Sequence, residues 1–268
     1  MACGSAYGTD DPTPFPTEAG PAEAGTDDAS PSDAGAEAST ADADAGCPSD
    51  RGPAMIAVGP TLDGQRFCID QNEVTVADYT QFREAGIPPT KQSSDCAWNT
   101  TFAVGGGRSP THPVVRVNWC DAKAFCSWAG KRLCGAIAGG PVPANGATTP
   151  EVAQWLYACS NGGTTTFPYP GAYKPGACNI DGDAASASAA AGSFAQCVTG
   201  AGARDLLGNV WEWVDSCQPN DAGIADDTCH FVGGAAGAFT SYTCKVVSGG
   251  NVTTRVDDIG FRCCADLD

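Results

Sequence analysis

The chain has 268 residues, of which 31 are acidic and 14 are basic, so its formal net charge is −17. Binding to a nucleic-acid backbone needs a basic surface, and this composition therefore excludes nucleic acid as the expected partner. No run of about 18 apolar residues is present, so the sequence predicts no membrane-spanning helix.

Composition changes after residue 52. Residues 1–52 consist mostly of Ala, Asp, Pro, Gly, Ser and Thr, and they carry eleven acidic side chains but only one basic side chain, Arg51. Such a segment has too few large apolar groups to offset the conformational entropy lost on ordering, so we predict a disordered acidic tail. Residues 53–268 are long enough for one large domain or two small ones, and we expect one domain there.

The 15 cysteines point to an oxidising compartment. Only two histidines, His112 and His230, accompany them, and no two cysteines have the C-x-x-C spacing of a structural zinc site. Disulfides are the better interpretation, and disulfides form in secreted, periplasmic or cell-surface proteins. We therefore expect an exported protein.

The first residues, Met1-Ala2-Cys3-Gly4-Ser5, resemble the junction at which a bacterial lipoprotein signal ends. In that interpretation Cys3 is lipidated and tethers the domain to a membrane, with the acidic tail as a spacer. Fourteen cysteines would then remain, which is an even number. The alternative is that Cys3 is an ordinary cysteine near the end of the chain.

Local patterns predict the following elements in chain order. Residues 66–70 (RFCID) have the composition of a strand. Thr75 and Asp78 have the spacing of a capping box, and the helix that they start ends at Gly86. Residues 113–119 (PVVRVNW) alternate like a strand, and a helix follows over about 121–129.

The second half has weaker patterns. Thr149 and Pro150 predict the start of a third helix, with Pro150 at the first helical position. Residues 160–204 are rich in Gly, Ala, Ser and Pro, and a loop of that length is expected to be held by disulfides or to bind something. Residues 259–262 (IGFR) are predicted to form a closing strand.

Four segments in this order carry a family resemblance, together with NEVTVADYTQF (72–82). They are HPVVRVNW (112–119), FCSWAGKRL (125–133), DLLGNVWEW (205–213) and IGFRC (259–263). The ordered set resembles the sulfatase-modifying-factor domain, whose fold is that of the formylglycine-generating enzyme. The resemblance covers roughly residues 54–264, and it implies a loop-rich α+β fold of the C-type-lectin kind.

The resemblance also implies where catalytic copper would lie. In the family enzyme, two cysteines spaced C-x4-C follow an Arg-Gly-Gly-Ser-like turn and bind copper through soft thiolates. The matching turn here is 232–235 (VGGA), and only Cys244 follows it before the closing strand. Counted from Cys263, Cys244 matches a structural cysteine of the family, and the copper positions fall near Gly234 and Phe239. We therefore expect no copper site.

Disulfide pairs are expected on two grounds. The family resemblance implies Cys126 with Cys263 and Cys159 with Cys244, whereas closeness in sequence favours Cys178 with Cys197 and Cys217 with Cys229. Cys120 and Cys134 flank one predicted helix and are candidates for a fifth pair. Three pairings stay open for the remaining four, which are Cys47, Cys68, Cys96 and Cys264.

Calcium is the cofactor that the resemblance implies. One family site uses backbone carbonyls and the Glu of the GN-x-WEW segment, and the matching positions here are Leu207, Gly208, Val210 and Glu212. Calcium accepts such oxygen ligands. The alternative is that Glu212 forms a salt bridge at a turn.

A second family calcium site begins at an Asn-Ile pair, which matches Asn179 and Ile180. The downstream Asp of that site has no clear counterpart, so Asp181 and Asp183 either substitute for it or only solvate a loop. A Ser-His-Asp triad would need His112 or His230, and neither accompanies a G-x-S-x-G motif.

The sequence as a whole favours a non-catalytic, exported binding or structural module with a protein or glycan ligand. The rival is a copper-dependent oxidase that generates formylglycine on sulfatase cysteines. A third reading is an enzyme of another type in the same fold.

Overall fold

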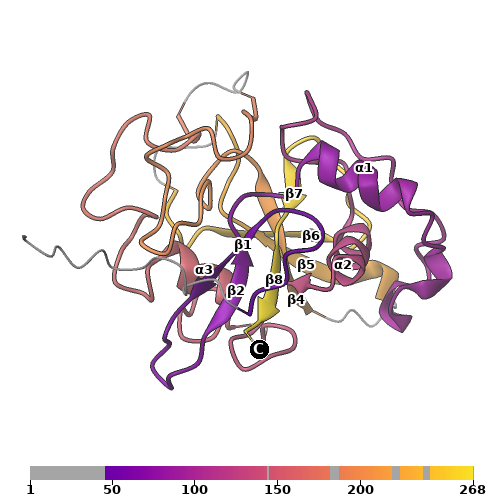
Figure 1. Ribbon diagram of the computed structural model, residues 1–268, viewed down its shortest axis with the longest axis horizontal. Helices are drawn as coiled ribbons and strands as arrows, with labels where there is room; N and C mark the ends of the chain where they lie inside the picture. Colours follow the sequence, from indigo (N-terminus) through magenta and orange to yellow (C-terminus); the bar gives the residue numbers. More distant parts are fainter. Residues whose placement is uncertain (1–45, 144, 182–186, 219–223, 238–241, 268) are drawn as a thin grey trace, which may run out of the picture. The chain divides into compact units, whose positions relative to one another are not determined.

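A computed structural model describes residues 46–143, 145–181, 187–218, 224–237 and 242–267 (Figure 1). The chain divides into two units, residues 1–39 and 40–268, and all described residues belong to the second. Cys3 and nearly all of the predicted tail lie outside the described residues, so those two expectations stay predictions.

The first sheet contains four antiparallel strands in the order β1-β2-β8-β3. The strands are β1 (Met55–Val58), β2 (Phe67–Asp70), β3 (Arg132–Leu133) and β8 (Cys263–Asp266). Strand β2 corresponds to the strand predicted over 66–70. It is buried along its whole length, so the sheet is covered on both faces there.

The second sheet has the order β6-β5-β4-β7. Its strands are β4 (Trp211–Gln218), β5 (Thr228–Val232), β6 (Val247–Asn251) and β7 (Ile259–Phe261), and β4 and β7 are parallel. Strand β7 is the predicted closing strand. Only Arg262 separates it from β8, so the chain crosses from the second sheet to the first at this residue.

Three α-helices and three short 3-10 helices complete the described part. The α-helices are α1 (Val76–Glu84), α2 (Trp119–Trp128) and α3 (Gln154–Cys159). The 3-10 helices are η2 (Pro89–Lys91), η3 (Ser94–Cys96) and η4 (Ile224–Asp226). No helix among the described residues is long and apolar enough to cross a bilayer.

Helix α1 begins at the predicted capping box. The Thr75 hydroxyl accepts a hydrogen bond from the Asp78 backbone N–H, and the Asp78 carboxylate accepts one from the Thr75 backbone N–H. Helix α2 has a second capping box, between Asn118 and Asp121, which the sequence analysis did not identify. Such caps satisfy N–H groups that have no partner inside the helix.

Two predicted elements differ from the structure. Residues 113–118 are buried except for Arg116, and they form only isolated β-bridges at Pro113 and Val115 instead of a strand, because Arg116 has a φ of 59° and interrupts the extended chain. The third helix begins at Gln154 rather than Pro150. Residues 150–152 form a turn, in which the Val152 and Ala153 N–H groups donate to the Thr149 carbonyl. Ala153 itself is extended and forms a β-bridge with Ala136, so the helix starts only after that bridge.

Seven disulfides join fourteen cysteines. They are Cys47–Cys68, Cys96–Cys120, Cys126–Cys263, Cys134–Cys264, Cys159–Cys244, Cys178–Cys197 and Cys217–Cys229. Four of these are pairs that the sequence analysis expected.

The expected pairing of Cys120 with Cys134 is wrong. Cys120 bonds to Cys96, and Cys134 bonds to Cys264. The reason lies in β8, where Cys263 and Cys264 are adjacent and point to opposite faces of the first sheet. Cys263 therefore reaches the core packed around α2, while Cys264 reaches Cys134 in the core on the other face.

Candidate functional site

Arg262 connects the two sheets through a fully buried guanidinium group. Its Nε and Nη2 donate to the two carboxylate oxygens of Glu212, each at 2.7 Å. Its Nη1 donates to the carbonyls of Asp70 and Gln71, and Nη2 also donates to the carbonyl of Arg204. Burial opposes the charged form, but the Glu212 carboxylate outweighs this and raises the pKa of Arg262.

Glu212 therefore lies in a salt bridge, which was the alternative to calcium binding. The indole N–H of Trp155 also donates to its Oε2, at 2.7 Å, so three N–H donors surround this carboxylate. Glu212 is 1% exposed. Donors that point at both oxygens occupy the positions that a cation would take, so Glu212 does not fit the role of a calcium ligand.

The other expected calcium positions are in contact with one another. The carbonyl of Asn179 accepts a hydrogen bond from the Asn209 backbone N–H at 2.9 Å. A Cβ on Gly208 would lie 2.4 Å from that same carbonyl oxygen, so only glycine permits this approach. Val210 and Ile180 contribute buried apolar side chains.

These contacts do not form the expected ligand set. Asp181, a candidate substitute, accepts from the Gly176 backbone N–H and the Tyr173 hydroxyl, while Asp183 lies outside the described residues. In the described part of the chain, no group of three or more His, Cys, Asp and Glu side chains is arranged to hold a metal. The residues named for the two family calcium sites therefore do not fit calcium here.

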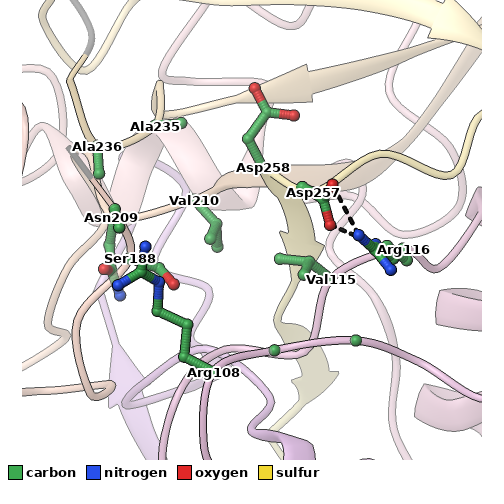
Figure 2. A pocket seen from close by; sticks show the side chains of 13 residues that line it. Arg108, Val115, Arg116, Ser188, Asn209, Val210, Ala235, Ala236, Asp257 and Asp258 are labelled. Atoms are coloured by element: carbon green, nitrogen blue, oxygen red, sulfur yellow. Dashed lines mark hydrogen bonds and ion pairs between the residues drawn. The ribbon is translucent and has the colours of Figure 1, made fainter. Parts of the chain in front are cut away.

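A cleft of about 500 Å³ opens beside this network, and we call it the charged cleft (Figure 2). Its walls come from six separate stretches of the chain, at 106–108, 115–116, 187–188, 209–210, 235–236 and 257–258. Residues 235–236 follow directly on the Gly-Gly turn after β5. The cleft thus lies where the family resemblance would put catalytic cysteines.

Charged side chains of both signs line this cleft. Arg116 and Asp257 form a two-bond ion pair, and these hydrogen bonds raise the pKa of Arg116 and lower that of Asp257. Arg108 extends toward Ser188 and Asn209 on the other side (Figure 2). Among the described residues, neither Arg108 nor Asp258 forms an ion pair, so each has a charge available to a ligand.

No cysteine thiol is available to the charged cleft within the described residues. Every cysteine from Cys47 to Cys264 is in a disulfide, including Cys244, which bonds to Cys159. Of the two positions that register with the copper cysteines, Gly234 is described and packs against Tyr242, while Phe239 lies outside the described residues.

The histidines do not form a catalytic triad. His112 Nδ1 lies 3.5 Å from the Ser188 hydroxyl, beside the charged cleft, and no carboxylate in the described residues pairs with its ring. His230 Nδ1 lies 2.9 Å from the Ser216 hydroxyl, and partial burial lowers the pKa of His230. Neither arrangement holds an imidazole between a nucleophile and an acid.

The family model for the sulfatase-modifying factor enzyme 1-like domain matches residues 19–267. The chain belongs to this family. The bovine formylglycine-generating enzyme (Bos taurus) is 27% identical over 186 residues, which are 59% of this chain and 45% of that protein. The bovine inactive C-alpha-formylglycine-generating enzyme 2 is 28% identical over 168 residues, which are 56% of this chain and 49% of that protein.

The chain thus spans less than half the length of these curated relatives. Among solved structures, PvdO from Pseudomonas aeruginosa is similar, with a TM-score of 0.56 at 19% identity, and the match covers 80% of this chain and 95% of that one. This likeness shows the fold alone. The α+β, loop-rich and disulfide-stapled fold expected from the sequence is confirmed.

Sequence reasoning missed the charged cleft. Arg108 stands after three glycines, and Asp257 and Asp258 are adjacent, but neither local pattern indicates that the two segments face each other. It also missed the role of Arg262, although that residue lies within a recognised segment. The signal was present there, because a conspicuous arginine within an apolar strand needs a buried acidic partner.

Proposed function

We propose that this domain is a non-catalytic, exported binding module whose ligand occupies the charged cleft. The disulfide between Cys159 and Cys244 carries the proposal. Copper-dependent formation of formylglycine needs a pair of thiolates, and the one cysteine after the Gly-Gly turn is consumed by this bond. The similarity to a relative named as inactive supports the same conclusion.

The same bonds support an exported location. Seven disulfides are consistent with an oxidising environment. We propose that Cys3 is lipidated and that the acidic tail, residues 1–52, spaces the domain from a bacterial membrane.

The charges of the cleft favour a peptide segment as the ligand. Arg108 can hold a carboxylate through two parallel hydrogen bonds, and Asp258 can accept a hydrogen bond from an ammonium or guanidinium group. Arg116 and Asp257 neutralise each other in their ion pair. A segment of a partner protein with one acidic and one basic side chain complements this arrangement better than a neutral glycan does.

Catalysis is tested with a sulfatase-derived peptide that contains the target cysteine. The peptide is incubated with purified protein, copper and oxygen, and its mass is followed by mass spectrometry. We expect no aldehyde, with an active formylglycine-generating enzyme as the positive control. Aldehyde formation by this protein would contradict the non-catalytic assignment and favour the oxidase.

Binding is tested with a displayed library of random peptides and an array of glycans. We expect enrichment of peptides that carry both charges, and a loss of that binding by about tenfold or more in Arg108→Ala and Asp258→Ala, because each removes one charge-assisted hydrogen bond. Lys91→Ala, an exposed change outside the cleft, is the matched control. Enrichment that survives both cleft variants would contradict the assigned site.

A further inference from the structure

Helix α2 has two different faces. Its inner face packs into the hydrophobic core and consists of Ala122, Phe125 and Cys126. The opposite stripe repeats every three or four residues and consists of Cys120, Lys123, Ala124, Ser127 and Trp128. This stripe forms one wall of a pocket of about 230 Å³, which we call the helix pocket. Among the described residues, none lines both the helix pocket and the charged cleft.

The segment between α1 and α2 forms the other wall, and it runs beside α2 (Figure 1). The disulfide between Cys96 and Cys120 fixes this segment to the helix. A second attachment runs through side-chain amides, because Gln92 hydrogen-bonds to Asn99 and Asn99 donates to the Asp121 carboxylate at 3.0 Å. The helix pocket is therefore formed before a ligand arrives, and a pre-formed site loses little conformational entropy on binding.

Aromatic rings supply much of the apolar lining of the helix pocket. Phe102 and Trp128 line it, and both rings contact Phe82 in the core, with centroid distances of 5.0 and 5.7 Å. Arg51 lies over the Trp128 ring at 5.1 Å, which further fixes the indole. A flat apolar group that enters the pocket therefore removes aromatic surface from water without any rearrangement of the core.

Two lysines and no acidic residue occur among the described residues that line the helix pocket. Lys91 is exposed, and in the described part of the chain its ammonium group forms neither an ion pair nor a hydrogen bond. Lys123 lies over the Trp119 ring at 4.3 Å, and it is 3.8 Å from a carboxylate oxygen of Asp95 and of Asp215. The charge of Lys123 is thus balanced by its neighbours, whereas Lys91 adds one positive charge that no described residue neutralises.

Two hydroxyl groups add neutral donors beside these charges. Ser93 and Ser127 line the helix pocket and are exposed, and neither hydroxyl has a hydrogen-bond partner among the described residues. Hydroxyl and ammonium groups form their strongest hydrogen bonds with anionic acceptors. An apolar pocket with free donors and one uncompensated positive charge is therefore complementary to an anion that has an apolar body.

We propose that the helix pocket binds a small aromatic acid, which is a single ring that carries one carboxylate. The ring packs against Phe102 and Trp128, and the carboxylate accepts hydrogen bonds from Lys91. The volume of about 230 Å³ is below that of ordinary drug-sized sites, so it favours one ring over a larger ligand. The single uncompensated charge favours a monocarboxylate over a dianion. This site is separate from the charged cleft and does not rest on the function proposed for that cleft.

The probe is phenylacetate, and its neutral counterpart phenylacetamide is the control for charge. Both are titrated into the purified full-length protein and followed by NMR, which reports affinity and location. We expect one phenylacetate per chain with a Kd on the order of 1 mM, as suits a ligand of about ten heavy atoms. Phenylacetamide should bind roughly tenfold more weakly, because it lacks the charge-assisted hydrogen bond. The indole N–H signal of Trp128, assigned from Trp128→Phe, should shift with phenylacetate.

Two pocket variants and one cleft variant locate the binding. Lys91→Gln removes the positive charge, so it should weaken phenylacetate binding by about tenfold and leave phenylacetamide binding unchanged. Ala124→Leu fills part of the pocket with a good helix former, so it should weaken the binding of both probes by about tenfold or more without lowering the melting temperature. Arg108→Ala, in the charged cleft, should change neither affinity.

Four results would overturn the proposal. One is the absence of saturable phenylacetate binding at concentrations well above the expected Kd. Another is equal affinity for the acid and the amide. A third is binding that is unchanged in both Lys91→Gln and Ala124→Leu. The last is binding that is lost only in Arg108→Ala, which would place the acid in the charged cleft. The peptide selection at the charged cleft is independent of all four, because its control, Lys91→Ala, alters the helix pocket alone.

Discussion

At the scale of single residues, two buried cations hold the segments around the first sheet. Arg262 donates all five of its N–H groups, and Lys131 donates to the Asp70 carboxylate at 2.6 Å and to the carbonyl of Pro53 at 2.7 Å. Asp70 contacts both cations: its carboxylate binds Lys131, and its backbone carbonyl accepts a hydrogen bond from Arg262. Removal of one partner from such a pair leaves an uncompensated buried charge, which costs about 3–5 kcal/mol.

Asp70 gives a pH-dependent prediction. Burial raises its pKa to about 6, although Lys131 and the Cys263 backbone N–H oppose the rise. The folded protein therefore binds this proton more tightly than the unfolded chain does. The resulting stability is fully present below about pH 4 and is lost as pH rises through about 6, which amounts to about 3 kcal/mol.

Urea unfolding at several pH values measures this term. The free energy of unfolding of the wild type, minus that of Asp70→Asn, should fall between pH 4 and pH 7. The variant should lack this change with pH, because the side chain that replaces Asp70 does not titrate. A difference that stays constant across this range would contradict the raised pKa.

At the scale of elements, both long helices begin with a capping box, but their surroundings differ. The box of α1 is partly exposed, whereas Asn118 and Asp121 at the start of α2 are buried. Asn118 also donates to Asn99, and Asp121 accepts from Arg255. The start of α2 is therefore a network that ties the helix to two other segments.

This network predicts unequal effects of two matched substitutions. Thr75→Ala should cost about 1 kcal/mol, which is typical for loss of a cap. Asn118→Ala should cost more, about 2–3 kcal/mol, because the buried side-chain oxygen of Asn99 also loses one of its two donors and keeps only Arg255. Chemical denaturation of both variants checks this, and equal losses would mean that the buried network adds nothing.

Elements that depend on neighbours in sequence could be predicted, and those that depend on distant contacts could not. The Thr75–Asp78 box needs only local spacing, so the start of α1 was correct. The start of α3 was not, because the long-range bridge between Ala136 and Ala153 holds Ala153 extended and separates the turn at 150–152 from the helix.

The candidate site shows the same division. The Glu212 segment was recognised by its motif, but its partner Arg262 lies 50 residues further along the chain. The charged cleft combines six separate stretches, and no local pattern reports which of them meet.

At the scale of the whole described domain, the connection from β7 to β8 joins the two sheets. Strand β7 belongs to one sheet and β8 to the other, and Cys263 and Cys264 at the start of β8 form disulfides on opposite faces. Residues 259–266 therefore link α2, the end of β3 and both sheets. The domain is expected to unfold as one cooperative unit.

Disulfides that close loops of very different length allow a quantitative test of how much closure of the chain stabilises the domain. Cys126–Cys263 spans 137 residues and Cys217–Cys229 spans 12. In the chain-entropy model, an isolated loop of the first length is worth about 5 kcal/mol and one of the second length about 3 kcal/mol. Cys134–Cys264 closes nearly the same long loop as Cys126–Cys263, so the long loop opens only when both bonds are removed. Denaturation under non-reducing conditions should therefore show a larger loss when Cys126, Cys263, Cys134 and Cys264 are all changed to alanine than the sum of the losses of the two double alanine variants. Cys217→Ala with Cys229→Ala is the short-loop control. Strictly additive losses would mean that local packing, rather than closure of the chain, determines what the two long-range bonds contribute.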